Sequence, residues 1–353
     1  MDFKLQDILV QAKEKEASDV HLNIGIPPIY RLNGKLVKSE FPILSALDVH
    51  ELIYSILTEH QMKSFEKDRQ FDFAYELDGV SRFRINIFRH RLGEAAAIRL
   101  IPTKIRSIEE LGLPKVISSL AELSRGIVLV TGPTGSGKST TLAALIDIIN
   151  STHYEHIVSI EDPIEYIHEH KNCVISQREI GEHTDSFASA LRVVLREDPD
   201  VILVGEMRDL ETISMALRAA ETGHLVFSTL HTNSAADTIE RMINAFPAHQ
   251  QAQARLQVAG TIEAVIAQTL LPTADGQGRV VAAELMLATP AIRNLIRDEK
   301  IYQIPSTIQI SRKMGMQSLD QSLKDLLMSG KITREEALRK AINKKAFLDY
   351  IDS

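Results

Sequence analysis

Residues 126–140 read Gly126-Ile-Val-Leu-Val-Thr-Gly-Pro-Thr-Gly-Ser-Gly-Lys-Ser-Thr140, an apolar run that ends in glycines and leads into a helical pattern. Gly132-x-x-x-x-Gly137-Lys138-Ser139 matches the Walker A pattern of phosphate-binding loops. The motif stands in the context that it requires, with a strand before it (127–130) and a helix after it (139–149). The sequence therefore predicts a site for a nucleoside triphosphate.

The residue types in this loop suit a polyphosphate. Glycines at 132, 135 and 137 let the backbone curve so that several N–H groups point inward, and the following helix adds its positive amino end. Lys138 is predicted to reach the β- and γ-phosphates, and the Ser139 hydroxyl to hold Mg²⁺. We expect the nucleotide to contact the loop residues Thr134, Gly135, Ser136, Gly137, Lys138, Ser139 and Thr140. A glycine-rich turn with a surface lysine is the alternative, but such turns seldom satisfy the whole motif.

Length and composition narrow the class of protein. A chain of 353 residues is too long for one small core and indicates two or three domains. Its 44% apolar and 25% charged residues are ordinary for a soluble protein, and no apolar run reaches the roughly 18 residues of a membrane span. The acidic N-terminus and the single cysteine, Cys173, favour a cytoplasmic protein without disulfides. The net charge of -7 argues against a dedicated nucleic-acid-binding protein.

Changes in periodicity divide the chain. Residues 1–103 mix helical stretches with alternating runs, which predicts an α+β domain, and Asn33-Gly34 indicates a hairpin. Ile101-Pro102 begins the transition to a linker at 104–114. Buried strands then alternate with helices over 115–275, which predicts an α/β core with a parallel sheet.

The last part of the chain has a helical pattern. Beyond about residue 235 we expect helices, and this interpretation includes the apolar positions of 256–270. One strand is expected from Arg279 to Leu285. Thr289-Pro290 and Thr333-x-x-Glu336 are helix-start signals, so 276–353 is interpreted as a helical region packed on the core.

Polar residues follow several of the predicted core strands. Glu161 and Glu165 come after 157–160, Glu206 after 201–204, and His231 after 225–230. In open parallel sheets, ligands bind beyond the carboxyl ends of the strands. We therefore expect these side chains and the phosphate loop to line one crevice.

Hydrolysis of a nucleoside triphosphate needs a carboxylate that orients or deprotonates water and a group that supports Mg²⁺. Walker B strands usually end in aspartate, but this one ends in Gly205-Glu206, whose longer side chain suits contact with Mg²⁺ through a water molecule. Glu165 is the predicted base, with a turn-capping surface acid as the alternative. His231 is the predicted γ-phosphate sensor. His224 stays open between a nucleotide contact and a structural histidine, because its spacing of seven places the two histidines on opposite strand faces.

Arginines cluster in the last strands of the N-terminal domain. Alternation places Arg82 and Arg84 on one strand face, and Arg99 follows in the next strand. They form either a solvated polar face or a set of cations that one subunit presents to the γ-phosphate held by another.

Four segments together resemble a known superfamily. They are the Walker A loop, Ile160–Tyr166 (Asp box), Arg196–Arg208 (atypical Walker B) and Thr222–Thr232 (His box). Read together, and nearly end to end, the chain resembles the ATPases of the type II/type IV secretion superfamily. Within that group it is similar to the pilus retraction ATPases, because Ala291-Ile-Arg-Asn-Leu-Ile-Arg297 looks like their C-terminal retraction motif, with Asp298 where glutamate is usual.

The resemblance implies a PAS-like N-terminal domain and a RecA-like P-loop ATPase domain with C-terminal helices. It also implies a homo-hexamer with ATP sites at the subunit interfaces, completed by the N-domain arginines. Mg²⁺-dependent ATP hydrolysis would then power pilus retraction from the cytoplasmic face of the inner membrane, on the platform protein, with a paralogous retraction ATPase as a further partner. No nucleic acid and no membrane insertion are expected.

Other functions stay open. A pilus-assembly or secretion ATPase, or an accessory retraction paralogue, would carry the same boxes. The assembly ATPases usually have a four-cysteine metal site, for which this sequence has too few cysteines. A nucleotide-gated scaffold and a nucleic-acid motor are further alternatives.

Overall fold

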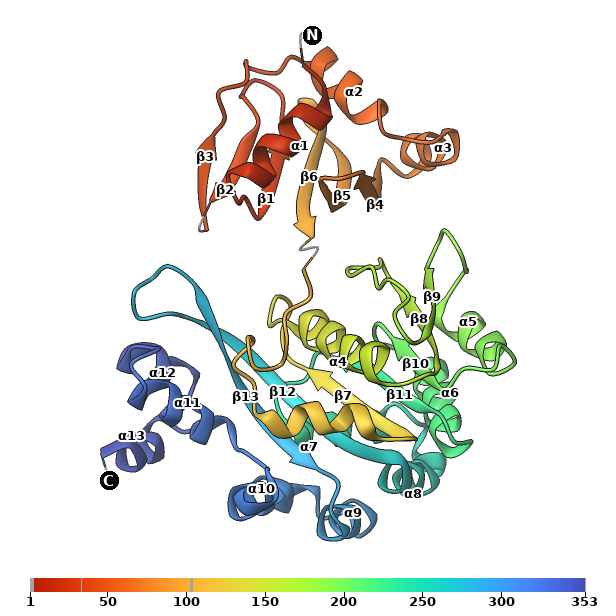
Figure 1. Ribbon diagram of the computed structural model, residues 1–353, viewed down its shortest axis with the longest axis vertical. Coiled ribbons are helices and arrows are strands. Elements are labelled where there is room, and N and C mark those ends of the chain that lie inside the picture. Colours follow the sequence, from red (N-terminus) through yellow and green to blue (C-terminus); the bar gives the residue numbers. More distant parts are fainter. Residues whose placement is uncertain (1–2, 33, 102–103, 353) are drawn as a thin grey trace. The chain divides into compact units, whose positions relative to one another are not determined.

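The computed structural model describes residues 3–32, 34–101 and 104–352, which form two compact units divided in sequence between Lys104 and Ile105 (Figure 1). The short segment Glu165–Ile167 is grouped with the first unit. Two predicted features, the Asn33-Gly34 turn and the linker start at Pro102, involve residues outside the described ones. In the described ranges, no helix is long and apolar enough to cross a membrane.

The N-terminal unit is a six-stranded antiparallel sheet in the order β3-β2-β1-β6-β5-β4, packed against helices. Its elements are α1 (Leu5–Glu14), β1 (Asp19–Leu22), β2 (Ile29–Leu32), β3 (Lys35–Lys38), α2 (Ala46–Tyr54), α3 (Glu59–Asp68), β4 (Gln70–Leu77), β5 (Ser81–His90) and β6 (Gly93–Ile101). The predicted alternation in β5 is present, since Phe83, Ile85 and Ile87 are buried. Helix α3 was not predicted, because Phe65 is its one buried residue and its apolar periodicity is weak.

The second unit contains a seven-stranded sheet in the order β13-β12-β7-β11-β10-β8-β9, parallel except for β13. Its elements up to the last strand are η1 (Lys115–Glu122), β7 (Gly126–Thr131), α4 (Lys138–Thr152), β8 (His156–Glu161), β9 (Val174–Glu179), α5 (Phe187–Val194), β10 (Val201–Val204), α6 (Leu210–Glu221), β11 (Leu225–Leu230), α7 (Ala235–Asn244), η2 (Ala248–Gln250), α8 (Gln251–Thr261), β12 (Ile262–Pro272) and β13 (Arg279–Leu287). Helix α4 and η1 cover one face of the sheet, and α5 to α8 cover the other. Because both faces are covered, every residue of β7, β10 and β11 is buried.

The C-terminal elements extend this unit. They are α9 (Pro290–Arg297), η3 (Ile301–Gln303), α10 (Ile304–Ile310), η4 (Arg312–Met314), α11 (Leu319–Met328), α12 (Arg334–Lys340) and α13 (Lys344–Asp352). The predicted helix starts are present, since the side chains of Thr289 and Thr333 accept hydrogen bonds from the backbone N–H groups of Ile292 and Glu336. Helices α9 and α10 join the main core, whereas α11 to α13 pack in a separate small core against β12 and β13.

The helical prediction for 256–270 was wrong beyond Thr261. Ile262–Pro272 is strand β12, which lies between β7 and β13 and is buried on both faces over most of its length. Such a strand has a continuous apolar sequence rather than an alternating one, and periodicity does not distinguish it from a buried helix. Two smaller differences are β13, which continues to Leu287, and the edge strand β9, which was not predicted.

Candidate functional site

The phosphate loop occupies the connection between β7 and α4. Gly132, Gly135 and Gly137 have φ angles of +140°, +76° and +90°, a region that side chains disfavour. A Cβ atom on Gly132 would lie 2.2 Å from the carbonyl oxygen of Gln268, so this position also requires glycine for space. Helix α4 begins directly after Gly137 and runs for 15 residues, so its amino end faces the loop. This is the geometry of a cradle for an anion.

The side chains of the loop also fit a polyphosphate. Thr134 and Gly135 are exposed at the loop tip, and the Lys138 ammonium donates to the backbone oxygens of Gly132 (2.9 Å) and Pro133 (3.3 Å). The Ser136 hydroxyl is buried without a hydrogen-bond partner among the described residues. Buried polar groups without partners are costly, and a phosphate oxygen would be a suitable acceptor for this hydroxyl. Ser139 and Thr140 follow in the first turn of α4, both half-buried.

A second group of side chains lies just beyond the carboxyl ends of β8, β10 and β11. Glu206 contacts Arg208 at 2.8 Å through one carboxylate oxygen and His231 Nε2 at 3.2 Å through the other. Asp162, which follows β8, lies 4.0 Å from Arg208. The parallel sheet therefore brings Glu206 and His231 together as the sequence suggested. It adds Asp162 and Arg208, which sequence reasoning missed even though Arg208 stands two residues after Glu206.

The cluster sets the charge of Glu206. Burial, the largest single influence, raises the pKa of this carboxyl, but Arg208 and His231 act in the opposite direction and hold the pKa below its usual value. Glu206 is therefore ionised at neutral pH. An ionised carboxylate can support a metal-bound water molecule but cannot donate a proton.

The two Asp-box glutamates differ in their surroundings. Glu161, the last residue of β8, accepts hydrogen bonds from the Ser159 hydroxyl (2.7 Å) and the Gln177 amide (3.3 Å). Glu165 lies four residues beyond the strand and is half-buried. Its role as catalytic base stays a prediction.

His224 lies at the other end of β11 from His231, roughly 20 Å away at the rise of a strand. Its backbone N–H donates to Ala219 O at 3.2 Å and Gly223 N–H donates to Ala220 O at 3.4 Å, the Schellman pattern that ends helix α6. Its ring Nδ1 is 2.9 Å from the same Ala219 oxygen. The structure thus does not bring His224 to the phosphate loop of its own chain, and it supports the structural alternative.

The N-domain arginines carry ion pairs. Arg84 pairs with Asp72 at 2.8 Å, and Arg99 pairs with Asp19 at 3.0 Å. Arg84 lies directly opposite Arg99 across β5 and β6, a repulsive arrangement that the two carboxylates offset. Arg82 lies on the same face of β5 as Arg84, as predicted. A role of the three arginines in nucleotide binding stays a prediction.

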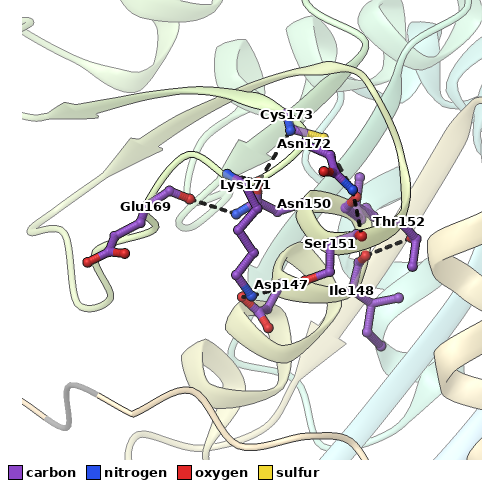
Figure 2. A network of polar contacts seen from close by, with 10 residues as sticks. Asp147, Ile148, Asn150, Ser151, Thr152, Glu169, Lys171, Asn172 and Cys173 are labelled. Atoms are coloured by element: carbon purple, nitrogen blue, oxygen red, sulfur yellow. Dashed lines mark hydrogen bonds and ion pairs between the residues drawn. The ribbon is translucent and has the colours of Figure 1, made fainter.

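The far end of the phosphate-loop helix is held by a polar network (Figure 2). Asn150 is fully buried in α4, where its amide donates to Glu169 O at 2.7 Å and accepts from Lys171 N–H at 3.1 Å. The Lys171 ammonium contacts Asp147 at 2.6 Å. These bonds tie α4 to the segment that leads from the Asp box to β9. Helix α4, which carries Lys138 at its amino end, is therefore anchored near its carboxyl end to Glu169 and Lys171.

A buried carboxylate supports the segment after His231. Glu284 of β13 is 5% exposed and accepts a hydrogen bond of 2.7 Å from Ala235 N–H, at the first turn of α7. Burial raises the pKa of Glu284, and repulsion from Asp237 and Asp320 adds to the increase, against the opposing effect of the Ala235 bond. The folded protein thus holds this proton more tightly than the unfolded chain.

Glu284→Gln is expected to melt at a higher temperature than the parent protein at pH 8, with a difference that shrinks as the pH falls toward 5. A raised carboxyl pKa contributes stability below its usual value of 4.5 and loses it as the pH rises through the folded-state pKa. Glutamine keeps the acceptor for Ala235 without the buried charge. Thermal melts between pH 5 and pH 8 measure this, with the exposed Glu221→Gln as control. A difference in melting temperature that does not vary with pH would contradict a raised pKa of Glu284.

Comparisons with known proteins identify the family of this chain. The family model described as type II/IV secretion system protein matches residues 3–339. The type IV pilus retraction ATPase PilT of Pseudomonas aeruginosa is 51% identical over 337 residues, covering 96% of this chain and 98% of that protein. The type IV pilus ATPase PilU of the same organism is 41% identical over 342 residues, covering 97% and 89%. A crystal structure of the pilus retraction motor PilT with bound ADP superposes with a TM-score of 0.91 at 48% identity, covering 98% and 99%. Because the family model spans nearly the whole chain, this protein belongs to the type II/IV secretion system protein family.

Proposed function

We propose that this chain is an ATP-hydrolysing motor that powers the retraction of type IV pili. The observation that carries the proposal is the phosphate loop together with the Glu206, Arg208 and His231 cluster at the neighbouring strand ends. The similarity to a retraction ATPase along 96% of the chain supports the task of retraction over other uses of ATP.

In the proposed site, the loop N–H groups and Lys138 bind the phosphates of ATP. Ser139 and Glu206 would hold Mg²⁺, Glu206 through water, and the ion when bound neutralises charge that develops on the phosphates. Glu165 accepts the proton of the attacking water. His231 senses the γ-phosphate. Its Nε2 lies 3.2 Å from the Glu206 carboxylate, so a movement of His231 toward the phosphate would alter its contact with Glu206.

The proposed assembly is a homo-hexamer. Each subunit has a PAS-like domain (1–103), a linker (104–114), a RecA-like core (115–275) and a C-terminal helical region (276–353). Arg82, Arg84 and Arg99 of one subunit reach the nucleotide of its neighbour. The 66% exposure of the Arg99 side chain supports this role, because its guanidinium remains accessible while paired with Asp19.

The motor would work at the cytoplasmic face of the inner membrane, on the pilus platform protein, with a paralogous ATPase as a second partner. Helix α9 carries the segment that resembles the retraction motif. Ile292 and Ile296 are buried in the core, whereas Asn294 and Arg297 are exposed. Substitutions that probe the motif therefore belong at the exposed positions.

The test is a count of surface fibres on cells that lack the gene, complemented with the parent gene or with Glu206→Ala. Abundant immobile fibres that only the parent gene corrects would support a retraction motor. Cells without fibres would instead identify an assembly motor, and an unchanged fibre count with normal motility would contradict both.

A further inference from the structure

A buried glutamine of the neighbouring strand holds the phosphate loop from behind. Gln268 follows Ala267, the last β12 residue that pairs with β7, so it stands beside the point where β7 turns into the loop. Gln268 is 4% exposed in a mostly apolar strand. A buried amide in such a place is expected to form hydrogen bonds with both of its ends.

Both ends of the Gln268 amide bind the loop region. Nε2 donates to the carbonyl oxygen of Ser136 at 2.8 Å, and Oε1 accepts from the Thr141 hydroxyl at 2.9 Å. A backbone carbonyl can only accept, so the nitrogen end must face Ser136. The amide therefore bridges the end of the loop and the first turn of α4 in one orientation.

The loop glycines lie close to the same residue. A Cβ atom on Gly132 would lie 2.2 Å from the backbone oxygen of Gln268, and one on Gly137 would lie 3.2 Å from its Nε2. Gln268 thus contacts the first and the last glycine of the motif. Both ends of the glycine motif therefore lie beside this one residue of another strand.

We infer that Gln268 is a positioning residue that orients the Gly137 N–H toward the bound phosphates, an inference that rests on the proposed function. In a trans peptide the C=O of Ser136 and the N–H of Gly137 point in opposite directions. Holding the oxygen against Gln268 directs the N–H away from β12. Gln268 does not touch the nucleotide and acts through this peptide group.

Gln268→Met keeps the length of the side chain and removes both hydrogen bonds. The expected result is at least a tenfold weaker affinity for ADP, measured by titration calorimetry, and a lower kcat/KM for ATP. Gln317→Met is the matched control, because Gln317 also donates to a backbone oxygen, Ala283 O at 2.9 Å, but does not touch the loop. The control is expected to bind ADP within twofold of the parent protein.

Gln268→Glu tests whether the hydrogen bond donated to Ser136 O, rather than the packing of the side chain, supports ADP binding. Its carboxylate keeps an acceptor for Thr141 but faces the Ser136 oxygen without a proton, whereas the protonated acid can donate as glutamine does. ADP affinity relative to the parent is therefore expected to recover between pH 8 and pH 5.5 in Gln268→Glu and not in Gln268→Met. Thr141→Val should weaken binding in the parent but add little to Gln268→Met.

Equal ADP affinity in Gln268→Met and the parent, or equal losses in the Gln268 and Gln317 variants, would overturn the inference. The inference would also be overturned if a folded Gln268→Glu protein did not recover ADP affinity as the pH falls. This second test applies even if the Gln268→Met variant does not fold. If the parent protein itself neither binds ADP nor hydrolyses ATP, the proposed function fails instead. The two failures are therefore distinguishable.

Discussion

Glu206→Gln is expected to lower the rate of ATP hydrolysis by about 100-fold or more while nucleotide affinity stays near that of the parent protein. Glutamine has nearly the same shape but no charge, so it loses the ion pair with Arg208 and the ability to support the charge of a metal-bound water. The phosphate loop does not involve Glu206, so binding should persist. Phosphate release under saturating ATP, together with ADP titration, measures the two effects separately.

Glu221→Gln is the matched control for this experiment. Glu221 is an exposed glutamate in the same unit, at the end of α6, and it accepts a hydrogen bond from Gln257 rather than from the cluster. The Glu221→Gln protein should hydrolyse ATP at the rate of the parent protein. Normal hydrolysis by Glu206→Gln would refute the assignment of Glu206 to the catalytic site.

Gly132→Ala is expected to abolish nucleotide binding and to lower the free energy of unfolding by on the order of 3 kcal/mol. The backbone at Gly132 has φ +140°, and the new methyl group would lie 2.2 Å from Gln268 O and 2.7 Å from Ser136 Oγ. The Gln268 oxygen belongs to the backbone of β12 and cannot move away without displacing that strand. Chemical denaturation and ADP titration provide the two measurements.

Gly135→Ala shows how much of this effect comes from the clash. Gly135 has φ +76°, but a Cβ atom there would meet nothing within 4 Å. Only the backbone strain remains, so its unfolding free energy should fall by about 1 kcal/mol. If the two alanine variants were equally stable, the close packing of Gly132 against Gln268 would not matter.

Most of the site could be predicted from local sequence. The glycine spacing of the loop, the apolar strands before Glu206 and His231, and the caps at Thr289 and Thr333 are short-range signals, and the structure has these elements where they were predicted. Short-range signals do not identify which residues distant in sequence will be in contact. Asp162 and Gln268 were missed because their partners are distant in sequence: Asp162 lies 4.0 Å from Arg208, and Gln268 bonds to Ser136 and Thr141. Arg208 was missed although its partner Glu206 is only two residues away.

The sequence by itself determined that the chain has a phosphate-binding loop, a parallel α/β core and polar groups at its strand ends. Motif spacing and continuous apolar runs are local features, so they can be recognised from neighbouring residues in the chain. Tertiary structure alone decided that Ile262–Pro272 is a strand, since burial between β7 and β13 removes the alternation that identifies one. It also decided that His224 closes α6 while His231 meets Glu206, because the two ends of one strand face different surroundings. The support of the loop by Gln268 likewise exists only once β12 lies beside β7.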